Sequence, residues 1–88
     1  MRQEPDHFGD QELVLVYIAE RLKEALALEE LLTKSEVDYL VEPDQYVTGT
    51  IFRRELTGAF FYVAPEQDAS VRQLMAGGGY KPWVPEAE

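Results

Sequence analysis

The sequence predicts an α+β fold, a two-layer sandwich with a mainly antiparallel sheet and two helices on one face. An apolar strand over residues 12–20 runs directly into a helical pattern over 21–34, which leads to a short strand over 37–42. A later apolar strand over 59–64 runs into Pro65 and a second helical pattern. The handedness rule for a β-α-β unit places both helices on the same side of the sheet. This arrangement is ferredoxin-like.

The first strand and the first helix follow from a change in the period of the apolar residues. Residues 13–18 are apolar at every position, which is typical of a central strand covered on both faces. From residue 21 the apolar side chains follow helical spacing, and the charged side chains face away from them. We expect one core, made of Leu15, Ile18, Leu22, Ala25, Leu28, Leu32, Val63, Val71 and Leu74.

Turn signals divide the middle of the chain into short strands. Pro43-Asp44 is expected to end the second strand. Residues 46–54 contain good strand formers and are expected to form a third strand. Leu56-Thr57-Gly58 is expected to turn the chain into the last apolar strand. The predicted order is therefore β-α-β-β-β-α.

The second helix has a clear start and a clear end. Pro65 stands at its first position and is followed by acidic residues in the first turn, which is favourable at a helix N-terminus. The three glycines at 77–79 are expected to end it. Residues 80–84 are expected to form at most a short edge strand, because prolines lack the amide that a longer ladder needs.

Length and composition predict one small globular domain. The chain has 88 residues, of which 45% are apolar, enough for a single core. We expect residues 1–11 to form a flexible N-terminal arm, residues 12–84 the single ferredoxin-like domain, and residues 85–88 a C-terminal tail. The N-terminus lacks the pattern of a signal peptide, and no apolar run reaches the length of a membrane span. We therefore expect a cytoplasmic protein without membrane contacts.

Charge restricts the class of partner. The formal net charge is −9, from 17 acidic against 8 basic residues. Nucleic-acid affinity depends on Lys and Arg that neutralise phosphates, so we predict no binding to nucleic acid. The chain contains no cysteine, which excludes a disulfide framework and a thiolate nucleophile or zinc ligand.

Side chains suited to catalysis are few and scattered. His7 with Asp6 and Asp10 places three potential metal ligands within one short segment, but a flexible arm would not hold them in place. Glu29 lies near the apolar stripe of the first helix, and we expect its carboxylate to reach water at the edge of that stripe. We predict no catalytic residue, no metal site and no cofactor.

Aromatic residues are the most informative candidates for a binding surface. In the last strand Phe60 and Tyr62 share one face and Phe61 lies on the other, and either face can be the one beneath the helices. The helix-free face then carries aromatics, which Tyr17 and Phe52 are expected to join. An exposed apolar face marks an interface. We predict that Tyr17, Phe52, Phe60 and Tyr62 form the interface of a homodimer.

Two other functions are alternatives to a dimer interface. An RNA-recognition motif stacks bases on exposed strand aromatics, but the basic residues that accompany such rings are missing here. The second alternative is a small-molecule sensor or enzyme with a pocket between protomers. Tyr46, Arg53 and Tyr62 would line this pocket and bind an anionic ligand.

Two segments carry a resemblance to a known family. VYIAERLKEALALEELLTKSEVDYLVE (16–42) and FYVAPEQDASVRQLM (61–75) resemble the prokaryotic signal transducing protein family, small domains of uncharacterised function with a PII-like fold. In that family a strand end like Val63-Ala64-Pro65-Glu66 starts the second helix. The usual glycine before the second strand is replaced here by Ser35-Glu36. The resemblance implies a ferredoxin-like fold and a regulatory or interaction role.

The leading hypothesis from the sequence is a non-enzymatic small regulatory or protein-interaction domain. We expect it to self-associate through the helix-free face of the sheet. A different protein or a small ligand remains an alternative partner.

Overall fold

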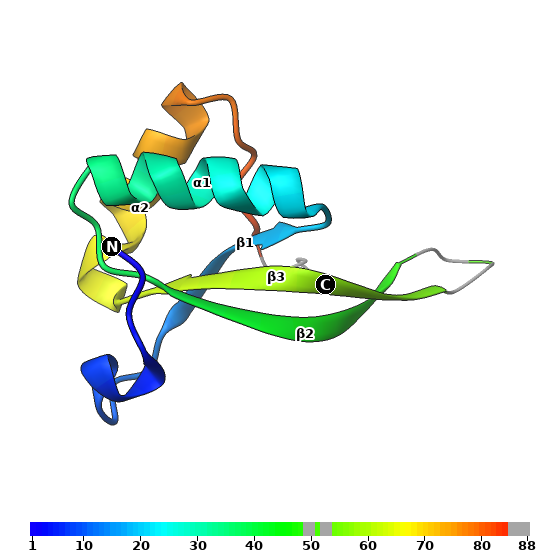
Figure 1. Cartoon of the computed structure of the whole chain (residues 1–88), viewed down its shortest axis with the longest axis horizontal. Helices are drawn as coiled ribbons and strands as arrows, with labels where there is room; N and C mark the ends of the chain where they lie inside the picture. The colour runs from blue at the N-terminus through cyan, green and yellow to red at the C-terminus, as the bar shows by residue number, and fades with distance from the viewer. Residues whose placement is uncertain (49–50, 52–53, 85–88) are drawn as a thin grey trace.

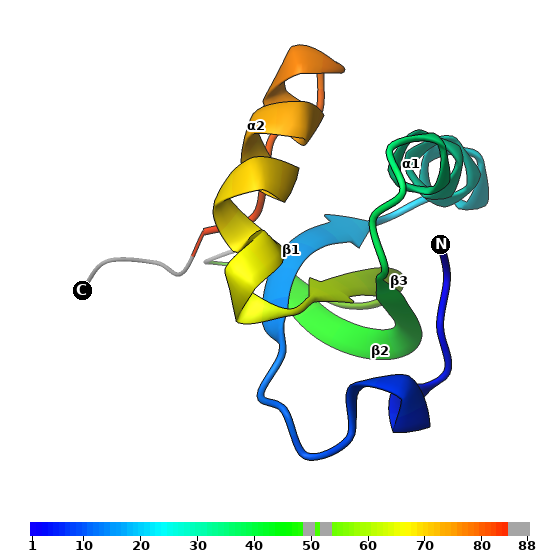
Figure 2. The same ribbon diagram turned by 90° about the vertical axis from the view of Figure 1, so that its left-hand side faces the viewer.

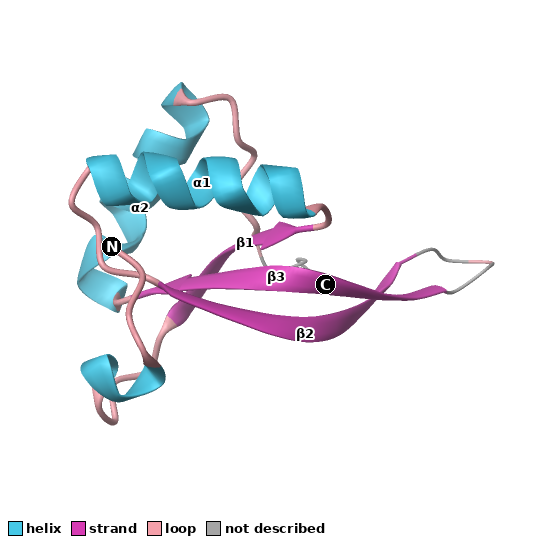
Figure 3. Cartoon of the chain, viewed as in Figure 1, coloured by secondary structure: helices cyan, strands magenta, loops and turns pink. Residues whose placement is uncertain are grey.

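The computed structural model describes residues 1–48, 51 and 54–84, and its sheet and helices form two layers (Figure 1). The elements are β1 (Val14–Ala19), α1 (Leu22–Lys34), β2 (Leu40–Thr48), β3 (Arg54–Val63) and α2 (Asp68–Gly77), with short 3-10 helices η1 (Pro5–Phe8) and η2 (Pro65–Gln67). The sheet has the order β1-β3-β2, with β3 antiparallel to both neighbours. Both helices lie on one face of it (Figure 3). The predicted ferredoxin-like α+β sandwich is confirmed.

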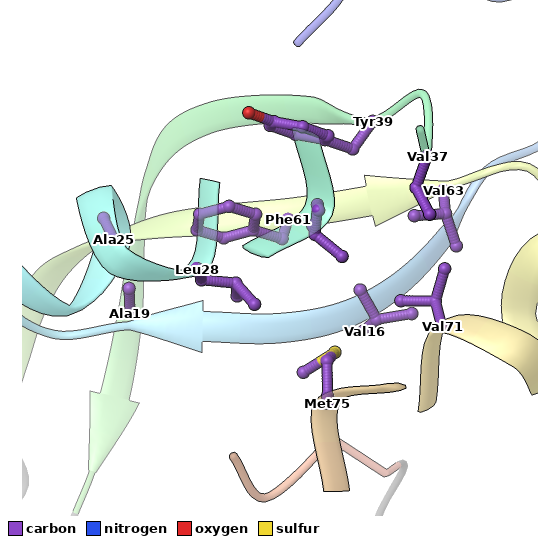
Figure 4. Packing of buried hydrophobic residues seen from close by; sticks show 11 residues of the cluster. Val16, Ala19, Ala25, Leu28, Val37, Tyr39, Phe61, Val63, Val71 and Met75 are labelled. Carbon is purple, nitrogen blue, oxygen red and sulfur yellow. The ribbon is translucent and has the colours of Figure 1, made fainter. Parts of the chain in front are cut away.

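The core fills the space between the sheet and the helices, where the labelled side chains of both layers converge (Figure 4). Phe61 is fully enclosed and stacks on Tyr39, with ring centroids 6.0 Å apart. Phe61 therefore faces the helices, and Phe60 and Tyr62 lie on the helix-free face. The buried core cluster contains Val16, Ala19, Ala25, Leu28, Leu32, Val37, Tyr39, Phe61, Val63, Val71 and Met75.

Because of a bulge in β1, Val16 and Ala19 lie in the core in place of the predicted Leu15 and Ile18. The pairing with β3 shifts between Leu15 and Tyr17, so Val16 is the extra residue. Val16 and Ala19 consequently point into the core, whereas Leu15 and Ile18 are only partly buried. The prediction of Leu15 and Ile18 as core residues was wrong for this reason.

The helices contribute most of the predicted core, with two differences. In α1 the buried residues are Ala25, Leu28 and Leu32. Leu22 points about 90° away from their mean direction around the helix axis, so its side chain is 75% exposed. In α2, Met75 is fully buried and Leu74 packs at the margin of the core. The prediction of Leu22 as a core residue was therefore wrong.

The predicted turn at Pro43-Asp44 was wrong, because β2 continues through it. Pro43 pairs with Ala59, and β2 is an edge strand of the sheet. At an edge, a proline is tolerated when its nitrogen faces away from the neighbouring strand. The predicted strand over 37–42, from Leu40 on, and the beginning of the one predicted over 46–54 thus belong to a single strand, β2. Residues 49–50 and 52–53 of the latter lie outside the described residues, and Arg54 belongs to β3.

The predicted turn at residues 56–58 was also wrong, because these residues lie inside β3. Gly58 is needed there by a close approach of neighbouring side chains. A Cβ atom at this position would come within 3.0 Å of Ile18 and of Tyr46. The glycine therefore marks a crowded position in a strand, and the predicted order contains one strand too many.

Both helices end in the same hydrogen-bonded motif. After α1, Val37 N donates to Leu32 O (3.0 Å) and Glu36, with φ of 59°, takes the left-handed position. After α2, Tyr80 N donates to Met75 O (2.8 Å) and Gly79, with φ of 88°, takes that position. The predicted glycine stop of the second helix is confirmed.

The N-terminal segment pairs with the chain at the start of β2. Gln3 N donates to Tyr39 O (2.8 Å), and Tyr39 N donates to Met1 O (3.2 Å). The segment then passes through η1 below the sheet, on the side away from the helices, before it enters β1 (Figure 2).

The C-terminal segment lies along the free edge of β1. Trp83 N donates to Val16 O (2.7 Å), and the Trp83 carbonyl accepts a hydrogen bond from Arg72. Arg72 also donates to Leu15 O (3.2 Å) and to the Asp68 carboxylate (2.7 Å). Residues 80–84 form no strand, so the short edge strand proposed for them is not observed. Pro82 has no amide to donate beside Trp83.

Neither α1 nor α2 is long and apolar enough to cross a membrane, and the described residues contain no other candidate span.

Candidate functional site

An open groove, the hairpin groove, lies between α1 and the β2–β3 hairpin and has a volume of about 310 Å³. It forms because β2 and β3 extend past the N-terminal end of α1, which leaves part of their helix-side face uncovered (Figure 1). Small side chains leave the space open beneath this helix end. The apolar lining comes from Ala19, Leu22, Ala25, Val41, Pro43 and Ala59.

Exposed apolar side chains lie on α1 and on the hairpin, and one of them, Leu22, lines the hairpin groove. Leu22 is 75% exposed and Leu26, one turn further along α1, is 55% exposed. On the hairpin, Val47 is 53% and Ile51 is 84% exposed. Scattered exposed apolar residues need no explanation, but a leucine pair beside an apolar groove indicates a contact surface.

Charges of both signs line the hairpin groove. The charged lining residues are Arg2, Arg21, Glu20 and Glu29, and Arg2 Nη1 is 3.7 Å from Glu29 Oε1. Glu29 also accepts a hydrogen bond from the Tyr39 hydroxyl at its backbone oxygen (3.3 Å). Its carboxylate thus lies at the edge of the apolar stripe beside a cation.

A second groove, the tail groove, lies at the C-terminal end of β1 against the C-terminal segment. It has a volume of about 350 Å³. Glu20 lines both grooves, so they meet at the end of β1. The tail groove is lined by Tyr17, Ile18, Glu20, Tyr46, Lys81, Pro82, Trp83 and Val84.

Two tyrosines of the tail groove have hydroxyls close to carboxylates. The Tyr17 hydroxyl donates to the Glu24 carboxylate, and burial together with this carboxylate raises the pKa of Tyr17 well above its ordinary value. The Tyr46 hydroxyl is enclosed and has no hydrogen-bond partner among the described residues. Burial and the nearby Glu20 carboxylate raise the pKa of Tyr46. Both phenols are therefore neutral at physiological pH.

The aromatic residues predicted as an interface are divided between the two faces of the sheet. Phe60 and Tyr62 lie on the helix-free face, but Phe60 is only 8% exposed. The bulge at Val16 places Tyr17 on the helix side, where its ring packs edge-on against Phe61 (6.5 Å). Phe52, the fourth predicted residue, lies outside the described residues.

Two of the residues predicted as a ligand pocket, Tyr46 and Tyr62, do not meet within one chain. Tyr46 pairs with Leu56, and Tyr62 lies six positions further along β3, a span of about 20 Å at the rise of a strand. They can share a pocket only if different protomers contribute them. Arg53, the third predicted residue, lies outside the described residues.

The helix-free face carries acidic side chains. Leu40, Glu42 and Asp44 lie opposite Tyr62, Phe60 and Gly58 and share their face. Burial and then the carboxylates of Asp44 and Glu42 raise the pKa of Tyr62. An anionic ligand would meet like charge here.

The N-terminal histidine packs against the chain. His7 Nε2 lies 3.5 Å from Asp38 Oδ2, and the described residues include no group of three His, Asp or Glu side chains placed to hold a metal ion.

Sequence reasoning missed Glu20, Glu24 and Trp83. In the sequence, Glu20 and Glu24 indicate only the start of a helix. Trp83 is an isolated aromatic residue and indicates no site. The path of the chain after Gly79 brings Trp83 to the end of β1, which no local pattern indicates.

The fold and the two grooves define a small α+β sandwich of ferredoxin-like topology with apolar grooves at one end. Comparison with protein-family models, curated proteins and solved structures returned no match. The resemblance to the signal transducing family therefore stays a prediction.

Proposed function

We propose that this chain is a non-enzymatic protein-interaction domain that self-associates through the hairpin groove. The observation that carries the proposal is Leu22, which is 75% exposed beside an apolar groove. Covering such surface against another chain removes it from water at about 25 cal/mol per Å², before the costs of association. A two-fold contact is the most common way for identical chains to do so.

Charge favours the hairpin groove over the helix-free face for this contact. A two-fold contact brings the same surface of both copies together. On the helix-free face it would bring the carboxylates of Glu42 and Asp44 from both copies close together, and Phe60 adds little apolar area there. At the hairpin groove, Arg21 and Glu29 can meet opposite charges across the two-fold axis.

The experiment measures the mass of the protein in solution at tens of micromolar by sedimentation or light scattering. Wild type is expected to have twice the chain mass. The net charge of −9 makes two copies repel each other, so association should strengthen from low to physiological salt. A wild type that stays monomeric at both salt concentrations refutes self-association.

Two sets of variants distinguish the surfaces. Leu22→Asp and the uncharged Leu22→Asn are both expected to give folded monomers, because Leu22 is the first residue of α1 and makes little contact with the core. Tyr62→Asp, on the helix-free face, is expected to leave the dimer intact. The reverse pattern, with Tyr62→Asp alone dissociating the dimer, would place the interface on the helix-free face.

A further inference from the structure

The tail groove has a different chemistry from the hairpin groove. Its walls contain three aromatic rings, from Tyr17, Tyr46 and Trp83, and its charged lining residues among those described are Glu20 and Lys81. Trp83 is 37% exposed at its lip. The groove therefore combines aromatic surface with a carboxylate.

The aromatic walls are held in position by the fold. Trp83 is fixed at its backbone, which donates to Val16 O (2.7 Å) and accepts from Arg72. The ring of Tyr46 packs edge-on against Phe60 at 6.2 Å, and that of Tyr17 packs edge-on against Tyr80 at 5.7 Å. A ligand would find these walls already ordered, which lowers the entropic cost of binding.

The charges around the groove select the sign of a ligand. Glu20 lines it, and the Glu24 carboxylate, which is not part of the lining, accepts a hydrogen bond from the hydroxyl of the lining residue Tyr17. Lys81 is the opposing charge among the lining residues. The two carboxylates exceed the single ammonium, and the chain as a whole carries a net charge of −9. Cations are therefore attracted and anions repelled.

The faces of aromatic rings add to this selection. Tyr and Trp rings attract a cation placed over the ring within about 6 Å, and an alkylated ammonium also gains from the apolar surface of such walls. Here Ile18 and Val84 supply aliphatic surface beside the rings. A neutral apolar ligand would gain the apolar contact without any attraction to Glu20.

We propose that the tail groove binds an alkylated ammonium group, with the aromatic rings of Trp83, Tyr46 and Tyr17 around it and the Glu20 carboxylate as its counter-charge. A free quaternary amine and a methylated lysine of another protein share this chemistry. The tail groove shares Glu20 with the hairpin groove, but Leu22 lines only the hairpin groove and the three aromatic residues line only the tail groove. Binding of the ammonium group can therefore be tested apart from self-association.

Trp83 gives the site its own reporter, because it is the only tryptophan of the chain. Choline is titrated into the protein while Trp83 fluorescence is followed, with sodium chloride added to the reference to match ionic strength. The control ligand is 3,3-dimethyl-1-butanol, the uncharged analogue of choline. We expect a saturable change in the millimolar range with choline and a response at least several-fold weaker with the alcohol. No saturation, or equal binding of both ligands, would overturn the proposal.

Matched variants locate the counter-charge. Glu20→Gln is expected to weaken choline binding several-fold or more, because it removes the carboxylate and keeps the size of an exposed side chain. Glu30→Gln is the control, since Glu30 lies on α1 and pairs with Lys34 (3.2 Å). Equal loss in both variants would indicate general charge attraction and would overturn the assignment to this groove.

A second titration distinguishes the sources of the ammonium group. A short peptide with trimethyllysine is compared with the same peptide carrying unmodified lysine. Tighter binding of the methylated peptide than of choline supports a protein partner, and equal binding supports a free amine. Repeating the choline titration on the uncharged Leu22→Asn is expected to give a similar affinity, so that a failed self-association test leaves this result unaffected.

Discussion

Val37 N donates to Leu32 O across the end of α1 at 3.0 Å, and both side chains are buried in the core. This bond requires Glu36 between them to adopt a left-handed conformation, with φ of 59°. A side chain with a Cβ atom is disfavoured there relative to glycine. The hydrogen bond that ends α1 and the burial of Val37 thus require a strained backbone conformation at the exposed residue Glu36.

Glu36→Gly is therefore expected to stabilise the fold, by about 0.5–1 kcal/mol, because glycine adopts this conformation without strain. Chemical unfolding monitored by circular dichroism measures the change. The neighbouring Ser35→Gly is the control, since Ser35 has φ of −89° and gains nothing from glycine. A loss of stability in Glu36→Gly would mean that another interaction of this glutamate outweighs the strain.

Two leucines of α1 differ in exposure, so their replacement by alanine is expected to lower the free energy of unfolding by very different amounts. Leu28 is fully buried, and Leu28→Ala is expected to cost about 2–5 kcal/mol of unfolding free energy through lost packing and the cavity left behind. Leu26 is 55% exposed, and Leu26→Ala is expected to change stability by less than about 0.5 kcal/mol. Similar costs for both variants would contradict the orientation of this helix.

Much of the fold was predictable because it depends on local patterns. The helix over 22–34 is visible in the spacing of apolar residues, and Pro65 and the glycines at 77–79 bracket the second one. These signals act within a few residues. A single sequence contains all the information that they need.

The differences arise where tertiary contacts decide. From sequence alone Pro43 indicates a turn, because the position of its strand at the edge of the sheet is not known. Gly58 also indicates a turn from sequence alone, because the close approach of Tyr46 and Ile18 appears only in the fold. The bulge at Val16 also depends on the pairing with β3, and it changes which residues of β1 after Val16 face the helices. The tail groove escaped prediction because Glu20 and Trp83 are distant in sequence and meet only in the folded chain.

Stability is expected to fall at alkaline pH because the fold keeps Tyr17 neutral. Burial and the Glu24 carboxylate raise the pKa of Tyr17 in the folded state above its unfolded value of 10.0. Above that pH the unfolded chain loses the proton first and binds fewer protons than the folded chain, so the free energy of unfolding decreases as pH rises. Urea unfolding at pH 8 and at increasing pH above about 10 measures the slope. Tyr17→Phe is expected to flatten it, and an unchanged slope in this variant would assign the effect to other tyrosines.

The position of the C-terminal segment is expected to depend on Arg72. Its guanidinium joins three elements, since it donates to Asp68 of α2, to Leu15 of β1 and to the carbonyl of Trp83. A lysine keeps the charge but lacks the planar fork that reaches these acceptors together. Arg72→Lys is therefore expected to release the segment while the fold remains.

Hydrogen exchange at the Trp83 amide measures this release, because that amide donates to Val16 O in the wild type. Loss of the charge-assisted bonds is expected to reduce its protection roughly tenfold or more. Trp83 fluorescence should shift to longer wavelength as the ring enters water. Arg21→Lys, at the N-terminal end of α1, is the control and should change neither signal. Unchanged protection in Arg72→Lys would show that the Trp83 backbone bond and the packing of Tyr80 are sufficient to hold the segment against β1.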